Sequence, residues 1–549
     1  MIAGVLSLYP AAGEDLLFGF GKRPEYPLYS PYFGRPHPFS PGDVERLARN
    51  FDLIYGMRPE KTTMDQVHRL NPEFRFIQHA GPSTVRSGIA EKQLRRQILY
   101  YPCATLAGAI NAKASAFKLE HRVGASRVSL KASTVAGAES RNSRQYVTWI
   151  RVDDELMRIE TFNAETGEIC VTRNFDGGNL QEHALNAGVY CPVYGVPPGG
   201  APEWEQALGL TYHYDPAYPA RWAHLFEELC EAVENGADGL WIDLVMDRGW
   251  REVDINGNEL RSAEENQSPC WNFASGRFYL KDELRKKNEE GVRVLQERFR
   301  AKYGRQPLLY GFSLTASRFE EGSGGHKYLL LPTEAKPRPL DGMGIEEFMG
   351  GYNMEEWLLW TRSRKVTPPK KALYSSTAAY RNWAENIRLL MRCAQSNLTA
   401  MPFIINANPR AAIFQELDRK SRHDWELWAY CGYLLGVEKK EGKCPTPLGV
   451  NMFYQENNQR SVRIDPLYYW RIGEPLESRK PKDFEKYQVK GTEVFQRRFS
   501  HGLVLVNPGA ERQRLTLDRE YYNPDASQRV SEAVLEEQSG MILLDKPPR

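Results

Sequence analysis

The strongest constraint on the fold is an alternation of short apolar runs with helical segments between residues 46 and 440. Strands that alternate with helices in this way pack as parallel βα units. The predicted fold class is therefore α/β, with a TIM (β/α)8 barrel. The runs expected to form strands are Phe51–Gly56, Phe74–Gly81, Leu240–Ile242, Pro307–Leu314, Asp341–Phe348, Leu373–Thr377 and Pro402–Asn408. Helices are expected over 89–112, 217–234, 280–304 and 379–396.

Three segments depart from this alternation. Residues 1–45 are rich in Pro, Tyr and Gly and predict an irregular arm on the surface. From 115 to 195, short β-rich segments separated by turn residues predict a small all-β module inserted into the barrel. The last hundred residues predict an antiparallel β-sandwich domain. The expected division is 1–114 for the arm and the first part of the barrel, 115–195 for the module, 196–445 for the rest of the barrel and 446–549 for the linker and β-domain.

The stretch from Glu234 to Gly249 carries the first candidate catalytic residue. A helix is expected to end at Asn235-Gly236, and Asp238-Gly239 is expected to form a turn. The apolar run that follows predicts a strand covered on both faces, and Asp243 stands where this strand should end. A carboxylate in this position is costly unless it is paired or used, and in a (β/α)8 barrel this end of the strands carries the chemistry. The alternative is an Asp243 that caps the next loop.

Glu346 is the second candidate, because it should end the strand two further on from that of Asp243. Two carboxylates that face one cleft can divide the roles of acid and base when their surroundings separate their pKa values. Glycoside hydrolysis requires such a pair. The alternative is a surface acid near a helix start, beside its neighbour Glu347.

Several aromatic and polar residues at or just past the expected strand ends are candidates for holding sugar. The chain has 12 Trp, 28 Tyr and 23 Phe, and aromatic rings stack on apolar faces such as those of sugars. Core packing accounts for most of these rings, and a hydrogen-bonded structural role is the alternative for the histidine. The substrate-binding candidates are Tyr55, His79, Tyr310, Tyr352 and Asn406.

Charge, cysteines and the N-terminus exclude other classes of function. The net charge of +2 gives no reason to expect a nucleic acid or an anionic membrane as partner. The 8 cysteines form no CxxC pair and the 10 histidines no cluster, so we expect free thiols, no metal and no cofactor, and a metal-dependent deacetylase is disfavoured. The N-terminus lacks the basic region of a signal peptide. We therefore expect a cytoplasmic protein, or a virion-associated or extracellular one that leaves by a non-classical route.

Taken together, these motifs resemble the glycosyl-hydrolase-like (β/α)8 families related to endo-α-1,4-polygalactosaminidases. The matching residues are Asp215–Arg221 (DPAYPAR), Gly236–Asp243 (GADGLWID), Asp341-Gly342 with Glu346 and Phe348, Gly473-Glu474-Pro475, Arg498-Phe499 and Leu503–Pro508 (LVLVNP). The resemblance implies that Asp243 and Glu346 are the paired carboxylates of a glycosidase acting on a polysaccharide, with amino sugars as one option. Leu244 and Phe312 depart from the pattern, since the families often have Asn beside the Asp and Asn-Gly in the later strand.

The β-rich insert resembles a module common in phage tail and virion proteins. The matching residues are Glu155–Arg158 (ELMR), Ile169–Arg173 (ICVTR), Asp176–Gly178 (DGG), His183 and Ala187–Val189 (AGV), with Asn174 at a position where the module prefers Gly. This resemblance implies attachment, with virion or homo-oligomer contacts through 115–195. It sustains a second hypothesis, in which the chain is a virion or tail structural protein, or a glycan-binding protein, with an inactive barrel.

Overall fold

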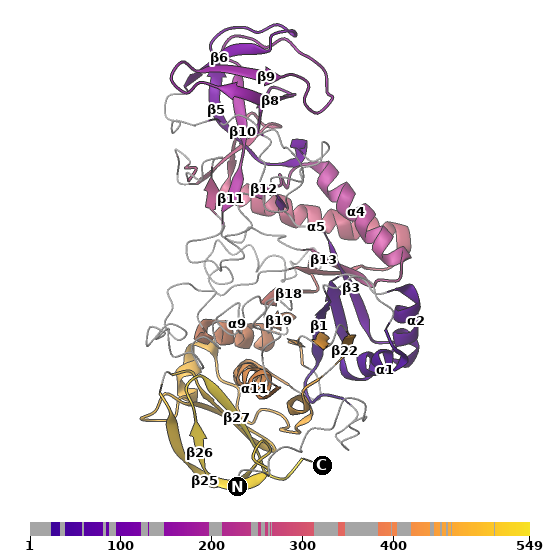
Figure 1. Ribbon diagram of the computed structural model, residues 1–549, viewed down its shortest axis with the longest axis vertical. Helices are drawn as coiled ribbons and strands as arrows, with labels where there is room; N and C mark the ends of the chain where they lie inside the picture. The colour runs from indigo at the N-terminus through magenta and orange to yellow at the C-terminus, as the bar shows by residue number, and fades with distance from the viewer. Residues whose placement is uncertain are drawn as a thin grey trace.

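A parallel barrel forms the centre of the molecule, with a small β-barrel at one end and an antiparallel β-sheet at the other (Figure 1). The computed structural model describes residues 23–32, 39–56, 60–80, 84–86, 95–121, 130, 148–196, 211–242, 251–253, 259–261, 264, 266–311, 339–345, 348, 383–396, 398–402, 419–439, 444–450, 453–456, 459–462, 464–509 and 511–548.

The central sheet has eight strands in the order β19-β18-β17-β13-β3-β2-β1-β20, and every neighbouring pair with a described register is parallel. The edge strands β19 and β20 lie against each other, so the sheet curls into a nearly closed barrel. This confirms the predicted (β/α)8 fold class. The strands are β1 (Leu28–Tyr32), β2 (Leu53–Gly56), β3 (Arg75–Ala80), β13 (Gly239–Ile242), β17 (Leu308–Gly311), β18 (Gly342–Ile345), β19 (Ala400–Pro402) and β20 (Leu448–Gly449).

Helices cover the outer face of this sheet. They are α1 (Pro41–Asn50), α2 (Lys61–Leu70), α4 (Pro219–Glu234), α5 (Lys281–Tyr303), α9 (Trp383–Gln395) and α11 (Arg419–Gly436). The Ser40 side chain caps α1 by accepting from the backbone N–H of Asp43 at 3.2 Å, and α5 ends at Gly304 in a left-handed conformation with φ 69°. Along β13, Leu240 and Ile242 pack in the core under the helices. Strand β13 is therefore buried on both faces, as its apolar sequence predicted.

Three aspartates at the amino edge of the barrel each bind the neighbouring strand, and we call them the aspartate clamps. Asp52 accepts from the backbone N–H of Leu28 at 3.2 Å. Asp238 accepts from that of Phe76 at 2.8 Å, and Asp341 from that of Leu309 at 2.8 Å. Each clamp precedes one strand and binds the start of the adjacent one, so the clamps join β2 to β1, β13 to β3 and β18 to β17.

Glycines follow two of the clamps for a steric reason. A Cβ added to Gly239 would lie 1.9 Å from the carbonyl oxygen of Leu308, and one added to Gly342 would lie 2.9 Å from that of Thr399. Each Asp-Gly pair thus holds one neighbouring strand through the carboxylate and lets the other approach closely. The turn expected at Asp238-Gly239 lies instead at Asn235-Gly236.

Stacked aromatic rings fill the inside of the barrel. The Trp241 ring stacks on Tyr55 with centroids 4.1 Å apart and on Tyr310 with centroids 5.9 Å apart. The Tyr29 hydroxyl donates to the carbonyl oxygen of Met401 at 3.0 Å, which links β1 to β19 inside the barrel. This interior is a packed core rather than a pore.

Strand β1 corrects the irregular arm expected over 1–45. Its residues Leu28–Tyr32 lie between β2 and β20 in the barrel sheet. Pro31 is part of this strand, although proline lacks the N–H group that a central strand donates to its neighbours. However, β20 pairs only with Leu28 and Tyr29, so this proline lies beyond the part of β1 that has partners on both sides. The expected strand at 373–377 lies outside the described residues, as does most of 402–408.

The inserted module is a closed six-stranded barrel in the order β10-β5-β6-β9-β8-β7, which we call the small barrel. Its strands are β5 (Tyr100–Leu106), β6 (Ala116–His121), β7 (Trp149–Val152), β8 (Glu155–Phe162), β9 (Glu168–Thr172) and β10 (Gly188–Pro192). The helix expected over 89–112 is wrong, because η1 (Arg95–Gln97) and β5 occupy this range. Pro102 lies inside β5, and a proline is not tolerated in the interior of a helix. The small barrel thus takes a strand from before residue 115.

The antiparallel C-terminal β-domain is confirmed, with strands in the order β23-β24-β27-β25-β26. They are β23 (Phe495–Phe499), β24 (Gly502–Asn507), β25 (Gln513–Asn523), β26 (Gln528–Leu535) and β27 (Ser539–Leu544). The remaining elements are β4 (Thr84–Arg86), β11 (Tyr194–Val196), β12 (Thr211–His213), β14 (Arg251–Val253), β15 (Gln267–Asn272), β16 (Arg277–Leu280), β21 (Phe453–Glu456), β22 (Gln459–Val462), η4 (Pro466–Tyr469) and η5 (Pro481–Tyr487).

Buried Arg497 joins the C-terminal sheet to the central barrel. Its side chain is 0% exposed, and it donates to the carbonyl oxygens of Leu434, Leu435 and Val437 at the end of α11. It also donates to the Glu438 carboxylate at 2.9 Å. A cation at the carboxyl end of a helix satisfies carbonyls that have no partner within the helix. Arg497 therefore fixes α11 against β23.

His423 makes a second junction between α11 and the β-domain. Its ring nitrogens lie 2.8 Å from Asp465 and 2.8 Å from Asp525. Burial opposes protonation of the ring, but the two carboxylates outweigh it and raise the pKa of His423 to about 12. The charged imidazolium thus links η4 and the β25–β26 turn to α11.

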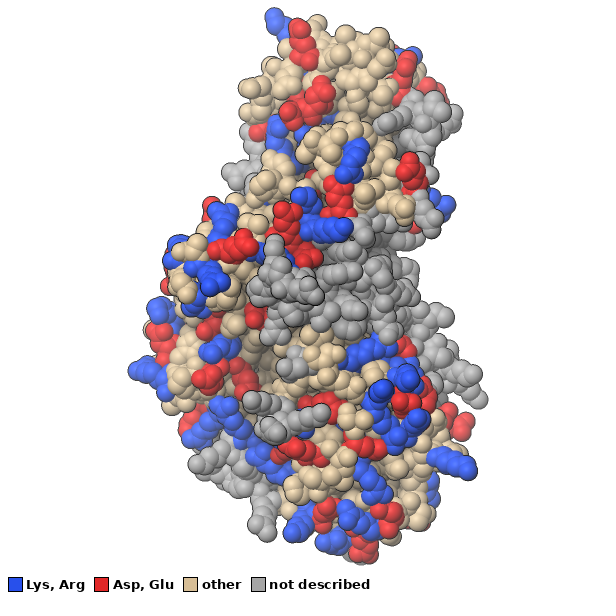
Figure 2. Space-filling view, turned by 180° about the vertical axis from the view of Figure 1, so that it is seen from behind, with Lys and Arg blue, Asp and Glu red and all other residues tan. Residues whose placement is uncertain are grey.

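Within the described residues, no helix is long and apolar enough to cross a membrane. The face shown in Figure 2 carries acidic and basic side chains interspersed, without a large area of one sign. This agrees with the small net charge of +2.

The clamps predict a local loss of stability when one carboxylate is removed. Asp238→Ala leaves the Phe76 N–H without its acceptor, and we expect a loss of about 1–3 kcal/mol. The control is Asp65→Ala, which removes an exposed ion pair with Lys61 on α2 and should cost about 0–1 kcal/mol. Urea denaturation followed by tryptophan fluorescence measures both. Equal losses in the two variants would contradict the clamp role.

Two adjacent arginines provide a matched test of the C-terminal junction. Arg497→Met leaves Glu438 and the α11 carbonyls without their donor, and we expect a loss of about 3–5 kcal/mol in the stability of this junction. Arg498→Met removes a half-exposed ion pair with Asp518 and should cost about 0–1 kcal/mol. Hydrogen exchange of α11 and β23 reports the difference. If exchange of α11 is unchanged in Arg497→Met, the proposed link is wrong.

Candidate functional site

The strands that precede the predicted catalytic pair end at the carboxyl edge of the barrel sheet. Strand β13 ends at Ile242 and β18 ends at Ile345, with β17 between them. Gly311 of β17 pairs with both Ile242 and Met343, so these ends lie side by side at one edge. Asp243 and Glu346 are the next residues in the sequence, and both lie outside the described residues. The strand ends match the prediction, and the catalytic roles of the two acids stay predictions.

Two of the predicted sugar contacts lie at this edge and are partly exposed. His79 pairs with Trp241 across the β3–β13 ladder, and Trp241 pairs with Tyr310. Residues two apart on a strand share a face, so His79 points to the same side as Ile77, the barrel interior. Tyr310 lies on β17, the neighbour of β13 on the side away from β3, and its ring stacks on Trp241. These two candidates and Trp241 therefore belong to one group of side chains.

The other predicted contacts are less informative. Tyr55 is 1% exposed, and the Trp241 ring covers one of its faces. Its observed contact is the packing against Trp241, and its role in sugar binding stays a prediction. Tyr352 and Asn406 lie outside the described residues. Trp241, which the sequence indicated only as a buried strand residue, stands at the centre of the aromatic stack.

The connections that follow β3 and β13 at this edge both contain additional strands. Strand β4 follows β3 after residues 81–83, and β14 and the β15–β16 hairpin follow β13. A four-stranded sheet, in the order β14-β11-β12-β4, joins the two loops. Cys270 and Tyr279 from the hairpin pack in the same core as the small barrel. The small barrel is thus attached to β3 and to β13, the strand whose sequence continues into Asp243.

The first motif of the family resemblance has an observed structural role in this attachment. The Asp215 carboxylate accepts from the Tyr279 hydroxyl at 2.9 Å and from the backbone N–H of Ala217 at 2.9 Å. Burial raises the pKa of Asp215. Arg221 is buried over the rings of Tyr214 and Trp222, and burial lowers its pKa to about 10. This motif ties the start of α4 to the β15–β16 hairpin. Helix α4 begins at Pro219, slightly later than the expected residue 217.

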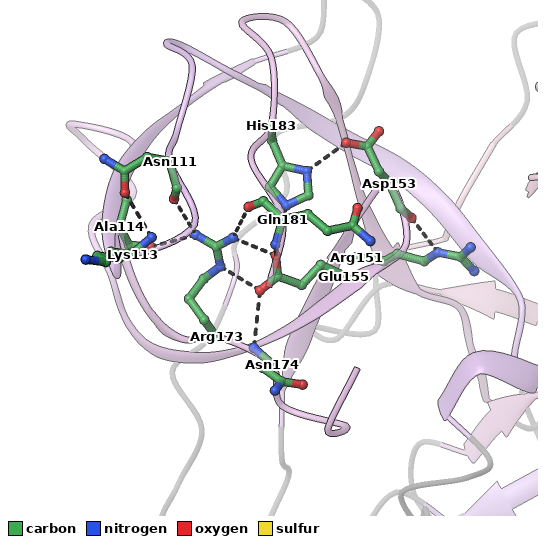
Figure 3. A network of polar contacts seen from close by, with 10 residues as sticks. All are labelled: Asn111, Lys113, Ala114, Arg151, Asp153, Glu155, Arg173, Asn174, Gln181 and His183. Carbon is green, nitrogen blue, oxygen red and sulfur yellow. Dashed lines mark hydrogen bonds and ion pairs between the residues drawn. The ribbon is translucent and has the colours of Figure 1, made fainter. Parts of the chain in front are cut away.

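A buried polar network connects the residues of the second resemblance inside the small barrel (Figure 3). Arg173 donates through two nitrogens to the two oxygens of Glu155, each at 2.6 Å, and both side chains are almost fully buried. The ring nitrogens of His183 lie 3.0 Å from Glu155 and 2.7 Å from Asp153. The motif residues Glu155, Arg173 and His183 thus form one structural unit.

The departure at Asn174 has a conformational explanation. Its backbone lies in the left-handed region with φ 51°, where glycine is favoured and Asn is tolerated better than most residues. Its N–H donates to the Glu155 carboxylate at 3.2 Å. Asn174 therefore keeps the turn that a glycine would form there.

The described residues contain no group of three or more His, Cys, Asp or Glu side chains that could hold a metal ion.

Comparison with known proteins finds distant likenesses of fold. No protein-family model matches the chain, and no curated protein matches it. Among solved structures, an isomaltulose synthase mutant of Erwinia rhapontici NX5 is similar, with a TM-score of 0.40, 10% identity, and coverage of 95% of this chain and 98% of that one. Eubacterium rectale Amy13B has a TM-score of 0.39, 9% identity, and coverage of 95% and 96%. The glycoside hydrolase domain of PelA from Pseudomonas aeruginosa has a TM-score of 0.31, 11% identity, and coverage of 75% and 90%. These likenesses assign neither a family nor an activity.

The network predicts that the small barrel is sensitive to acid. Burial opposes ionisation of Glu155, but hydrogen bonds from Arg173 and His183 outweigh it and lower the pKa of Glu155. A lowered folded-state pKa contributes stability that is complete above the unfolded value and is lost as the pH falls through the folded one. We expect hydrogen exchange in β8 and β9 to accelerate over this acidic range. Glu155→Gln should remove that dependence, whereas Glu165→Gln at an exposed turn should keep it. An unchanged pH profile in Glu155→Gln would contradict this assignment.

Proposed function

We propose that the chain is a glycoside hydrolase that cleaves a polysaccharide with Asp243 and Glu346 as its two carboxylates. The observation that carries the proposal is the arrangement of strands at the carboxyl edge. The sequence continues into one acid directly after β13 and into the other directly after β18, and only β17 separates these parallel strands. This edge is where (β/α)8 enzymes hold their reacting groups.

In the proposed mechanism one carboxylic acid protonates the leaving glycosidic oxygen, and the other carboxylate acts as base or nucleophile. We assign the acid role to Glu346, because the pKa of a glutamate is easily raised wherever its carboxyl is buried, and a raised pKa keeps the group protonated. A separation of about 5–5.5 Å between the carboxyl groups gives retention of configuration, and one of about 6.5–9.5 Å gives inversion. No cofactor takes part.

The substrate class follows from the side chains around the edge. Tyr310 and His79 are partly exposed beside Trp241, and together they offer ring faces and a hydrogen-bonding group to a sugar. Polysaccharides with amino sugars are the first class to test, because of the resemblance to polygalactosaminidase-related families. The small barrel, attached beside β3 and β13, offers further contacts to a long chain.

A second candidate function is attachment, in which the barrel holds glycan without cutting it and the small barrel binds a virion neighbour or a second copy. The observation that favours it is the network of Glu155, Arg173 and His183. The residues that match the virion module are thereby linked in one closed barrel at an end of the molecule (Figure 1).

Release of reducing ends separates the two candidates. The wild type, Asp243→Asn and Glu346→Gln are incubated with amino-sugar exopolysaccharides, neutral exopolysaccharides and cell-wall glycans. We expect release by the wild type and a loss of roughly 100-fold or more in each variant, because general acid–base catalysis contributes about 10²–10⁴-fold.

Glu297→Gln is the matched control, since this acid lies on the exposed side of α5 and should leave activity unchanged. Full activity in both Asp243→Asn and Glu346→Gln would show the assignment to be wrong. Glycan binding by the wild type without release would favour attachment.

A further inference from the structure

Two cysteines that are far apart in the sequence meet in the core of the small barrel. Cys103 lies in β5 and Cys191 in β10, and their side chains are 2% and 4% exposed. The two sulfur atoms are 2.7 Å apart, and the Cys191 thiol donates a hydrogen bond to the sulfur of Cys103. A disulfide bond is about 2.0 Å long, so a displacement of less than the width of an atom would bring the sulfurs to bonding distance.

The ladder between β5 and β10 explains why the two thiols face each other. Cys191 pairs with Tyr101 in the antiparallel register. Residues two apart on a strand share a face, so Cys103 points to the same side as Tyr101 and lies diagonally across from Cys191. The register shift between Val189 and Tyr190 falls at the same place. The backbone pairing of these strands therefore holds the thiols together.

We propose that Cys103 and Cys191 form a disulfide when the chain meets a low-molecular-weight disulfide such as oxidised glutathione. One protein thiolate attacks the small disulfide, which forms a mixed disulfide and releases one thiol. The second protein thiolate then attacks the mixed sulfur and releases the second thiol. The protein dithiol is oxidised, the small disulfide is reduced, and the two protons pass to the released thiols.

The bond would close the chain across β6, β7, β8 and β9, which lie between the two cysteines in sequence. Closing a long loop lowers the conformational entropy of the unfolded chain and thereby stabilises the folded state. Oxidation would thus hold the small barrel at its β5–β10 pairing. Cys170 is exposed, so it provides a thiol with a different environment in the same module.

The test uses the full chain, unfolded with its thiols reduced and then refolded in a buffer of reduced and oxidised glutathione. This route gives the oxidant access to both thiols before the core forms. Alkylation of free thiols and digestion after Lys and Arg place Cys103 in peptide 97–113, Cys191 in peptide 174–221 and Cys170 in peptide 159–173. We expect peptides 97–113 and 174–221 to be joined, lighter by two hydrogen atoms, and separated by reductant.

Cys103→Ser and Cys191→Ser should each lose the joined peptides, whereas Cys170→Ser should keep them. The oxidised wild type should also unfold at a higher urea concentration than the reduced wild type, a difference that Cys103→Ser should not show. The proposal would be overturned if Cys103 and Cys191 were both found alkylated in the refolded wild type. It would also be overturned if either cysteine were linked to Cys170 as often as the two are linked to each other. The wild-type result decides the question even if a variant fails to fold. None of these outcomes depends on hydrolytic activity.

Discussion

The carboxylates of Asp52, Asp238 and Asp341 set the alignment on which the rest of the barrel depends. Each binds the N–H of the first or second residue of a neighbouring strand, so it fixes where two strands begin relative to each other. In a parallel sheet, the alignment of the amino ends also decides which residues meet at the carboxyl ends. A shift of one residue would turn Trp241 from the interior to the helix layer. The side chains that carry the barrel's structure thus lie at the opposite edge from the side chains proposed to carry its chemistry.

This division gives a physical meaning to the motifs of the family resemblance. In both Asp-Gly pairs, the aspartate and the glycine serve strand packing, because the carboxylate binds one neighbour and the missing Cβ admits the other. The acid that follows each strand is a separate element of the motif. Asp215 and Arg221 likewise support the attachment of the small barrel. Most of these motif residues are therefore explained by folding alone. A chain can keep them while its substrate contacts change, and Leu244 and Phe312, which depart from the family pattern, are changes of that kind.

Buried charges recur where one part of the molecule meets another. Arg497 binds the end of α11 to the C-terminal sheet, and Arg173 binds Glu155 within the small barrel. Each guanidinium is satisfied by several acceptors, which is the condition under which a buried charge is tolerated. The sequence resemblance pointed to Arg498, but it is the neighbouring Arg497 that is fully buried. Alternation along β23 places one arginine inside and the next outside, and sequence alone does not tell which is which.

The sequence by itself determined the elements whose signal is local. The apolar run before Asp243 and the hairpins of the insert follow from propensity and periodicity, and the structure confirms them. Strand β1 was missed within a segment rich in Pro, Tyr and Gly, and strand β5 was assigned to a helix although Pro102 argues against a helix interior. Tertiary structure decided which distant residues meet: Cys103 with Cys191, His183 with Glu155, and Trp241 with Tyr55 and Tyr310. Contacts of this kind depend on strand order and register, which are set by the packing of the whole sheet rather than by any short stretch of sequence.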